Sequence, residues 1–167
     1  MALAYHDPLT GLPNRRLFKE HLNQALLQAK RKEKQLSLLY LDIDNFKHIN
    51  DTMGHDIGDQ FLQQFANRIR GCLREMDTFA RMSGDEFTIL LPYFESSDNV
   101  ELVAQRIFNS LKEPWNVEQY QFTASVSMGI VIYPQDGIDS KSLLKHVDIA
   151  LYQVKNRGRN GYQFYKT

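Results

Sequence analysis

Two carboxylates, Asp85 and Glu86, stand at the bend between two runs of strand-forming residues. The runs are residues 78–82 and residues 87–91, and the turn that joins them contains Gly84. Aromatic and β-branched residues on both sides of a glycine-containing turn predict a β-hairpin. The chain must therefore form a sheet in which one tight turn carries two negative charges.

A second acidic pair, Asp42 and Asp44, follows residues 36–41, an almost continuous apolar run of strand length. Such a run predicts a central strand that is covered on both faces. Carboxylates delivered from two strand ends can share a divalent cation, and Mg²⁺ usually keeps a substrate phosphate among its oxygen ligands. The pattern therefore indicates nucleotide chemistry, although a solvated hairpin tip is the simpler interpretation of any single Asp-Glu turn.

Composition limits the class of protein. The chain has 167 residues, of which 43% are hydrophobic, and this suits one globular domain over residues 1–167. Lys plus Arg and Asp plus Glu both number 20, so no overall charge favours nucleic acid or an anionic membrane. We therefore expect neither as a partner of this domain.

A lone cysteine, Cys72, excludes an internal disulfide, and its place on the apolar side of a predicted helix makes it a core residue. The sequence shows neither a secretory segment nor an apolar run of transmembrane length, so we expect a cytoplasmic location. Because motif residues begin at Asp7, we expect the domain to be cut from a longer protein, whose other segments could anchor it to a membrane.

Apolar spacing predicts the remaining elements. They are a helix that begins after Asn14 and ends in the basic run at residues 30–34, helices over residues 58–73, 100–111 and 140–156, the last capped by Ser140, a long strand over residues 122–133, and an edge strand over residues 162–165. Their order predicts an α/β sandwich, in which helices flank a central mixed, mainly antiparallel sheet.

Four familiar sites are excluded. Counting an EF-hand loop from Asp42 puts Lys47 where a glycine is needed and Met53 where a bidentate glutamate is needed. Ser83 has Arg81, not glycine, two residues upstream, so it is not a nucleophile elbow. A Walker P-loop is missing, and the five histidines and one cysteine show no zinc-ligand spacing.

Several motifs then occur in order along the chain. They are residues 7–15, residues 42–47 with Asn50 and Asp51, Gly54-His55-Asp56, Gly58-Asp59, residues 83–87, residues 148–152, Lys155, and residues 158–160. Together they closely resemble the GGDEF family of diguanylate cyclases, which join two GTP molecules into cyclic di-GMP. The resemblance covers Asp7 to about Tyr165 and implies a nucleotidyl-cyclase-like palm with its signature motif on the hairpin. Residues 161–165 also resemble GGDEF domains that precede an EAL phosphodiesterase domain in bacterial signalling proteins.

Ser83 departs from the family pattern, because it replaces the first glycine and makes the motif SGDEF. Its CH₂OH group could crowd a phosphate or the base, or its hydroxyl could donate to a phosphate oxygen. Since Gly84, Asp85 and Glu86 are intact, we favour a competent cyclase. The alternative is a degenerate domain that binds GTP or cyclic di-GMP and regulates an adjoining EAL-type domain.

The resemblance implies that Asp42, the backbone carbonyl of Ile43, and Asp85 bind two Mg²⁺ ions, for which Mn²⁺ could substitute. Two cations would neutralise the triphosphate and stabilise the departing pyrophosphate. Glu86 would deprotonate or orient the attacking 3′-hydroxyl, although a second metal ligand or a simple turn carboxylate remains open. Asp44 is expected to pair with a nearby cation or with backbone.

The same resemblance assigns the nucleotide contacts. Backbone N–H groups of Asn45, Phe46 and Lys47 would hold the β- and γ-phosphates, and the Lys47 ammonium would add charge. Lys155 and Arg159 would contact the terminal phosphate, although taken alone they are ordinary helix-end cations. Ser83 and Gly84 would lie beside the nucleotide.

Asn50 and Asp59 are implied as the guanine-selecting residues. A carboxylate can accept from guanine N1–H and from its exocyclic amine, which adenine does not offer in that arrangement. Without the family resemblance, either residue could be a helix cap.

Catalysis by this family implies a homodimer, since one half-site cannot present both nucleotides. Sensor or EAL domains fused to the chain would supply the pairing. Arg74 and Asp77 have the RxxD spacing of the family's inhibitory product site, to which Arg106 could contribute. An Arg fork and an Asp acceptor suit cyclic di-GMP, although the two residues could equally form a local ion pair.

Overall fold

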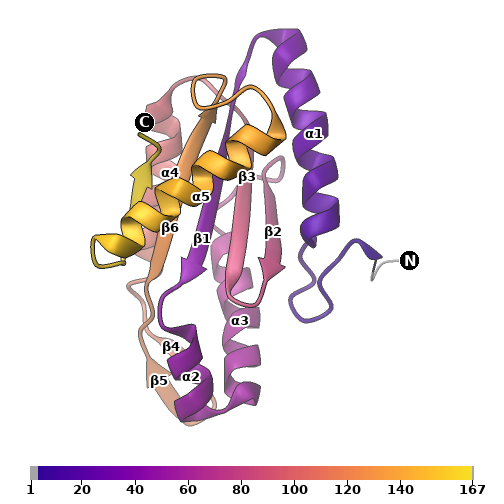
Figure 1. The fold of residues 1–167 in the computed structure, drawn as a ribbon. Helices are drawn as coiled ribbons and strands as arrows, with labels where there is room; N and C mark the ends of the chain where they lie inside the picture. The colour runs from indigo at the N-terminus through magenta and orange to yellow at the C-terminus, as the bar shows by residue number, and fades with distance from the viewer. Residues whose placement is uncertain (1–3, 167) are drawn as a thin grey trace.

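The computed structural model describes residues 4–166 and consists of a five-stranded sheet with helices on both faces (Figure 1). The helices are α1 (Arg15–Lys32), α2 (Phe46–Met53), α3 (His55–Arg70), α4 (Ser97–Ser110) and α5 (Ser140–Asn156). The strands are β1 (Gln35–Ile43), β2 (Thr78–Ser83), β3 (Glu86–Phe94), β4 (Trp115–Val117), β5 (Tyr120–Phe122), β6 (Val126–Tyr133) and β7 (Gly161–Phe164).

The main sheet has the strand order β2-β3-β1-β6-β7. All its pairings are antiparallel except that of β6 with β7, which is parallel. The mixed, mainly antiparallel sheet is therefore confirmed, as is the β2–β3 hairpin. β1 lies at the centre, and every one of its residues after Gln35 is buried, as its apolar run predicts.

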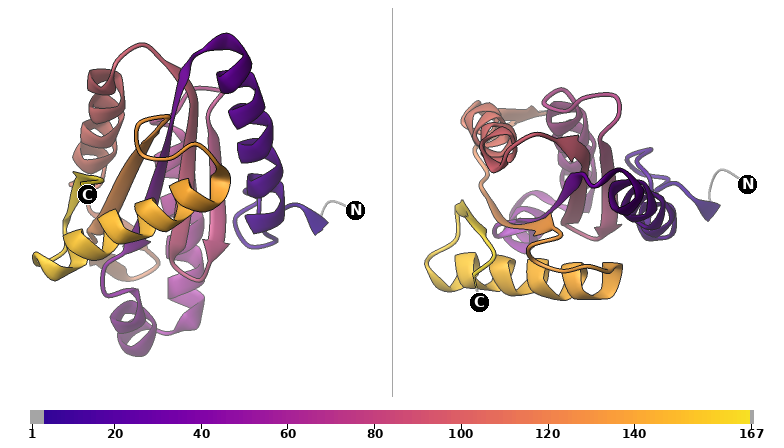
Figure 2. Two further views of the ribbon diagram at one scale, coloured as in Figure 1. Left: turned by 45° about the horizontal axis from the view of Figure 1, so that its top comes forward. Right: turned by 90° about the horizontal axis from the view of Figure 1, so that it is seen from above.

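Alternate residues of β1 face two separate hydrophobic clusters. Leu39 and Leu41 pack with α3 and α4, whereas Leu38 and Tyr40 pack with α1 and α5. The view from above shows the two pairs of helices on opposite sides of the sheet (Figure 2). Since side chains alternate along a strand, Asp42 follows Tyr40 onto the face that α5 covers.

The sequence predicts one helix over residues 58–73, and this is wrong at both ends. α3 begins at His55 and ends at Arg70, and the separate helix α2 precedes it. Gly54, with a φ of 97°, divides the two helices, because glycine adopts this backbone conformation without steric cost.

The single strand predicted over residues 122–133 is also wrong, because β5 ends at Phe122 and β6 begins at Val126. β5 pairs with β4 in a separate two-stranded sheet. That hairpin carries Trp115, which is 1% exposed and packs edge-on against Phe61 of α3 with 5.0 Å between ring centroids. Burial of this ring against α3 explains why the hairpin leaves the main sheet.

The last helix and the edge strand were placed nearly correctly from sequence. Asp139, rather than Ser140, caps α5, because its carboxylate accepts a hydrogen bond from the Ser142 backbone N–H at 2.7 Å. β7 forms the predicted edge strand. No helix within residues 4–166 combines the length and the apolar character needed to cross a membrane.

Candidate active site

The two predicted carboxylates meet at one end of the sheet. The turn of the β2–β3 hairpin lies at the same end of the sheet as the end of β1 (Figure 1). Asp42, the last residue but one of β1, lies opposite Glu86 of β3, and Asp85 occupies the hairpin turn. The Ile43 backbone N–H donates to the Asp85 backbone carbonyl at 3.1 Å, which ties the turn to β1. Burial, followed by the neighbouring Asp42 carboxylate, raises the pKa of Asp85 to about 7.

One oxygen of Asp42 is satisfied and the other is not. Oδ2 accepts from the ammonium of Lys155, which α5 brings to the end of β1. Oδ1 is buried and accepts no hydrogen bond from any of the described residues. Buried polar atoms without a partner are rare and mark a place where an ion or a ligand is expected.

These groups fit a divalent cation. A bare carboxylate oxygen lies beside a second carboxylate whose negative charge the fold disfavours, and a cation would relieve both costs. Within residues 4–166, no three His, Cys, Asp or Glu side chains gather into a metal cluster. Mg²⁺ is commonly held by one or two carboxylates together with substrate phosphates and water, so a pair of carboxylates is sufficient.

Asp44 has a different environment from Asp42. Its carboxylate accepts from the hydroxyls of Ser125 at 2.6 Å and Ser127 at 2.7 Å, and from the Asn160 backbone N–H at 3.0 Å. The Arg159 guanidinium lies 3.7 Å away. Asp44 thus pairs with a cation and with backbone, as expected, and it fastens the turn after α5 to the end of β1.

Lys155 on α5, and Arg159 in the turn that follows this helix, reach the site because α5 packs closely on β6. A Cβ added at Gly129 would lie 2.5 Å from the Leu151 backbone nitrogen and 2.6 Å from the Val147 carbonyl oxygen. Only a glycine admits this approach. The structure places both cations beside carboxylates at the strand end, Lys155 at Asp42 and Arg159 at Asp44.

The predicted phosphate-binding backbone lies at the start of α2. Asn45 adopts the left-handed conformation with a φ of 57°, and its side chain makes no capping hydrogen bond. The first N–H groups of a helix have no intrahelical acceptor, so those of Phe46 and Lys47 remain available. Because α2 begins three residues after β1 ends, these donors lie close in sequence to Asp42.

The predicted guanine residues lie across the α2–α3 junction. Asn50 of α2 packs so closely on Gly58 that a Cβ added there would lie 1.9 Å from the Asn50 Oδ1 atom. Asp59 is the next residue of α3 and is exposed. Its carboxylate makes no hydrogen bond or ion pair with any residue of the described range 4–166.

Sequence reasoning did not anticipate the partners of Glu86. The Tyr40 hydroxyl donates to Glu86 Oε1 at 2.9 Å, and the Ser83 hydroxyl donates to the same oxygen at 3.2 Å. Burial, and then the hydrogen bond with Glu86, raises the pKa of Tyr40. Burial and the Glu86 charge likewise raise the pKa of Asp148 on α5. Tyr40 and Asp42 are two residues apart on β1 and therefore share one face of the sheet. This spacing is the signal that could have identified Tyr40.

Arg81 was also missed as a site residue. Its Nε donates to the Gly84 carbonyl at 2.9 Å, and its Nη1 donates to Asp7 at 3.1 Å. Burial acts to raise the pKa of Asp7, but hydrogen bonds from Thr10 and the Arg81 charge outweigh it and lower that pKa. Arg81 thus joins the N-terminal motif to the signature turn.

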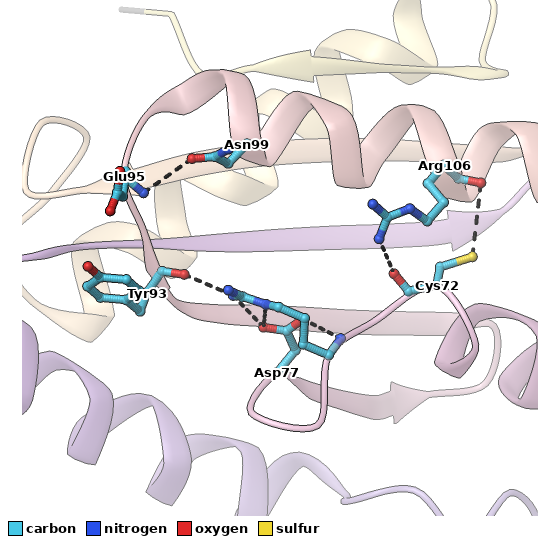
Figure 3. Close-up of polar contacts among 7 residues, drawn as sticks. Cys72, Asp77, Tyr93, Glu95, Asn99 and Arg106 are labelled. Atoms are coloured by element: carbon cyan, nitrogen blue, oxygen red, sulfur yellow. Dashed lines mark hydrogen bonds and ion pairs between the residues drawn. The ribbon is translucent and has the colours of Figure 1, made fainter.

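The three residues predicted for product binding lie together elsewhere, around one cavity: Arg74 and Asp77 follow α3, and Arg106 belongs to α4. Arg74 donates to Asp77 at 2.9 Å and to the Tyr93 carbonyl at 2.8 Å. Arg106 donates to the Cys72 carbonyl at 3.0 Å (Figure 3). A cavity of about 290 Å³ lies between them. The local ion pair left open by the sequence is therefore present, and the Asp77 side chain is 1% exposed.

The family comparison matches nearly the whole chain. Residues 4–161 match the model described as "Diguanylate cyclase, GGDEF domain". The chain is 41% identical over 165 residues to the bifunctional diguanylate cyclase/cyclic di-GMP phosphodiesterase MucR of Pseudomonas aeruginosa, covering 99% of this chain and 24% of that protein. It is 40% identical to the cyclic di-GMP phosphodiesterase NbdA of the same organism, covering 98% of this chain and 21% of NbdA. The chain therefore spans about a quarter of the length of these relatives.

Solved structures agree with this match. A structure comprising only the GGDEF domain of TpbB from Pseudomonas aeruginosa superposes with a TM-score of 0.94 at 38% identity, covering 96% of this chain and 94% of that one. The coiled coil and GGDEF domain of DgcB from Caulobacter crescentus, solved in complex with c-di-GMP, gives a TM-score of 0.87 at 29% identity, covering 98% and 86%. Fold and sequence thus point to the same family.

Proposed function

This chain belongs to the GGDEF family, and on that basis we propose that it condenses two GTP molecules into cyclic di-GMP with release of two pyrophosphates. One observation carries the proposal: the buried, unpartnered oxygen of Asp42 lies beside Asp85, whose pKa is raised to about 7. Without a ligand here, the unpaired buried oxygen of Asp42 and the disfavoured charge of Asp85 would both destabilise the fold with no gain in function.

Mg²⁺ bound by Asp42, Asp85 and the Ile43 carbonyl would neutralise the triphosphate and polarise the α-phosphoryl group. Glu86 accepts the proton of the attacking 3′-hydroxyl. The 3′-oxygen then bonds to the α-phosphorus of the second GTP, and the bond from that phosphorus to the bridging oxygen breaks as pyrophosphate leaves. Lys155 and Arg159 hold the negative charge of the leaving group.

Substrate selection rests on the α2–α3 junction. Asn50 and Asp59 contact the guanine edge, while the backbone N–H groups of Asn45, Phe46 and Lys47, with the Lys47 ammonium, hold the β- and γ-phosphates. Ser83 and Gly84 border the nucleotide. GTP is thereby distinguished from ATP by an acceptor that adenine cannot satisfy.

The reaction requires two copies of the chain, because each site presents one nucleotide and the second must approach in line. We propose that a sensor or EAL-type domain fused to this one supplies the pairing. The isolated chain should therefore be mostly monomeric, with turnover that rises more than linearly with protein concentration.

The test is chromatography of the products from GTP and Mg²⁺ at several protein concentrations, with Asp85→Ala as the inactive control. Cyclic di-GMP and pyrophosphate should form in the wild type and be absent from the variant. A fused dimeric chain that binds GTP and still makes no product would refute the proposal.

A second function has an observation in its favour. NbdA, named only as a phosphodiesterase, is 40% identical to this chain, and Ser83 replaces the first glycine of the motif. The domain would then bind GTP and regulate an adjoining domain without turnover. GTP binding measured by calorimetry, together with no product in the chromatographic assay, would indicate this second function rather than the first.

We also propose cyclic di-GMP as a feedback ligand at Arg74, Asp77 and Arg106. The cavity between them is bordered by guanidinium groups that can fork onto phosphate or guanine acceptors (Figure 3). The DgcB structure in complex with c-di-GMP supports product binding by a relative. Because Asp77 is covered by Arg74, the ligand must first draw the guanidinium away from the carboxylate.

A further inference from the structure

Glu86 is held at one oxygen by two hydroxyl groups from different strands. Tyr40 approaches from β1 and Ser83 from the end of β2, and both donate to Oε1, at 2.9 Å and 3.2 Å. Among the described residues, none donates to Oε2. The carboxylate is therefore fixed through one oxygen and open at the other.

The strand register explains how the two donors reach the same atom. Ser83 pairs with Glu86 across the hairpin turn, and Tyr40 lies on β1 two residues before Asp42, which is the cross-strand partner of Glu86. The Tyr40 ring is 7% exposed and packs in the cluster under α1 and α5, so its hydroxyl cannot swing away. Ser83 contributes a donor that a glycine at this position lacks.

We infer that Tyr40 and Ser83 act as a pair of positioning residues that aim the free oxygen of Glu86 at the attacking 3′-hydroxyl. This inference rests on the proposed cyclase reaction. It gives the SGDEF sequence a role, because the serine hydroxyl is already engaged with Glu86 rather than turned toward a phosphate. The proton of the 3′-hydroxyl passes to Oε2, while Oε1 keeps both hydroxyl donors.

Steady-state kinetics on the full chain test the pair. Tyr40→Phe and Ser83→Ala should each lower kcat about ten- to a hundredfold, the effect of a small misplacement, while KM for GTP changes less than about twofold. Ser83→Thr, which keeps the hydroxyl, should recover most of the lost kcat. Tyr133→Phe removes a tyrosine hydroxyl at the far end of β6 and should behave as wild type.

A Glu86→Gln background provides the decisive comparison. Because both hydroxyls act through Glu86, adding Tyr40→Phe or Ser83→Ala to Glu86→Gln should lower kcat no further. An additional tenfold loss in that background overturns the inference, and so does an increase in turnover in Ser83→Gly, which would mean that the serine only crowds the site.

Crystal structures test the positioning of Glu86 independently of catalytic activity. In the wild type, Glu86 Oε1 should lie within hydrogen-bond distance of both hydroxyls, and the carboxylate should rotate in Tyr40→Phe and in Ser83→Ala. An unchanged carboxylate in both variants overturns the inference. A wild type that makes no product removes the proposed cyclase activity instead, and these structures still show whether the pair positions Glu86.

Discussion

The carboxylates at the strand ends and the Arg74–Asp77 pair differ in how completely their charges are paired. At the strand ends, one Asp42 oxygen has no donor and the pKa of Asp85 is raised to about 7. In the second region, Asp77 is covered by Arg74, which also donates to the Tyr93 carbonyl. In the first region Lys155 pairs with the other Asp42 oxygen and leaves Oδ1 open, whereas in the second the Arg74 guanidinium covers the Asp77 carboxylate.

This difference predicts different responses to a ligand. A cation at the strand ends adds favourable contacts and removes repulsion, so binding there stabilises the fold. A ligand at Arg74 must first break an existing pair, so its net affinity is reduced by that cost. A site whose charges are unpaired without ligand suits a substrate, and a site whose charges are already paired without ligand suits a regulator.

The largest expected effect comes from removing one strand-end charge. Asp85→Asn should lower cyclase activity by about 10³-fold or more, equivalent to ~4 kcal/mol, because a cation ligand is lost. The metal-free variant should nevertheless unfold at a higher temperature than wild type, since repulsion with Asp42 is removed. Activity assays and thermal melts check both, with Glu20→Gln on α1 as a matched control. A variant that is less stable than wild type would contradict this difference between the two regions.

Guanine selection should show the next largest effect. Asp59→Ala should weaken binding of a non-hydrolysable GTP analogue by about 1.5 to 3 kcal/mol, because a charge-assisted hydrogen bond is lost, and should leave the weaker binding of the ATP counterpart unchanged. Calorimetry measures both.

Gly58→Ala tests the same guanine pocket through Asn50. The new methyl group must displace Asn50, whose Oδ1 would lie 1.9 Å from it, so GTP affinity should fall although alanine favours the helix. Equal affinities for GTP and ATP in the wild type would rule out the assigned pocket.

Arg74→Ala removes the guanidinium that covers Asp77. It should destabilise the fold by about 2 kcal/mol, because the buried Asp77 loses its partner, and it should abolish binding of cyclic di-GMP without weakening GTP. Denaturant unfolding and product titration report the two effects separately. Unchanged product affinity in this variant would make the inhibitory-site assignment wrong, whatever the status of catalysis.

The smallest effect is a pH dependence of stability. The folded pKa of Asp85, about 7, lies above its usual value of 3.8, so the folded state binds a proton more tightly than the unfolded state. Stability of the metal-free domain should therefore fall as pH rises from about 4 to 7, and Mg²⁺ with nucleotide should reverse the loss above pH 7. Melts in Asp85→Asn should lose this dependence. A slope of the opposite sign would show that Asp85 is not the group responsible.

The sequence predicted the parts of the molecule in which one local rule dominates. The apolar run before Asp42 fits a covered strand, and the acidic turn followed from the residues on either side of Gly84. The separate helix α2 follows from the backbone conformation of Gly54, whereas the split of residues 122–133 depended on tertiary packing, in particular on Trp115 against Phe61. Local propensity does not contain that information.

The candidate site divides in the same way. Asp42, Asp85 and Glu86 could be named because residue type and strand position are visible in the sequence. The donors to Glu86 were missed, because Tyr40 meets it from the neighbouring strand β1, and Ser83 was considered only against the nucleotide, as an obstacle or as a donor to a phosphate oxygen. Side-chain hydrogen bonds across a sheet depend on register, and register is fixed by the whole fold.

The most direct test of the metal site is a crystal structure with Mn²⁺ and a non-hydrolysable GTP analogue, recorded with anomalous scattering from manganese. We predict an anomalous peak between Asp42 Oδ1 and Asp85, with Lys155 turned from Asp42 toward phosphate. A nucleotide bound with no metal peak between these carboxylates, or a metal held elsewhere, would contradict the account.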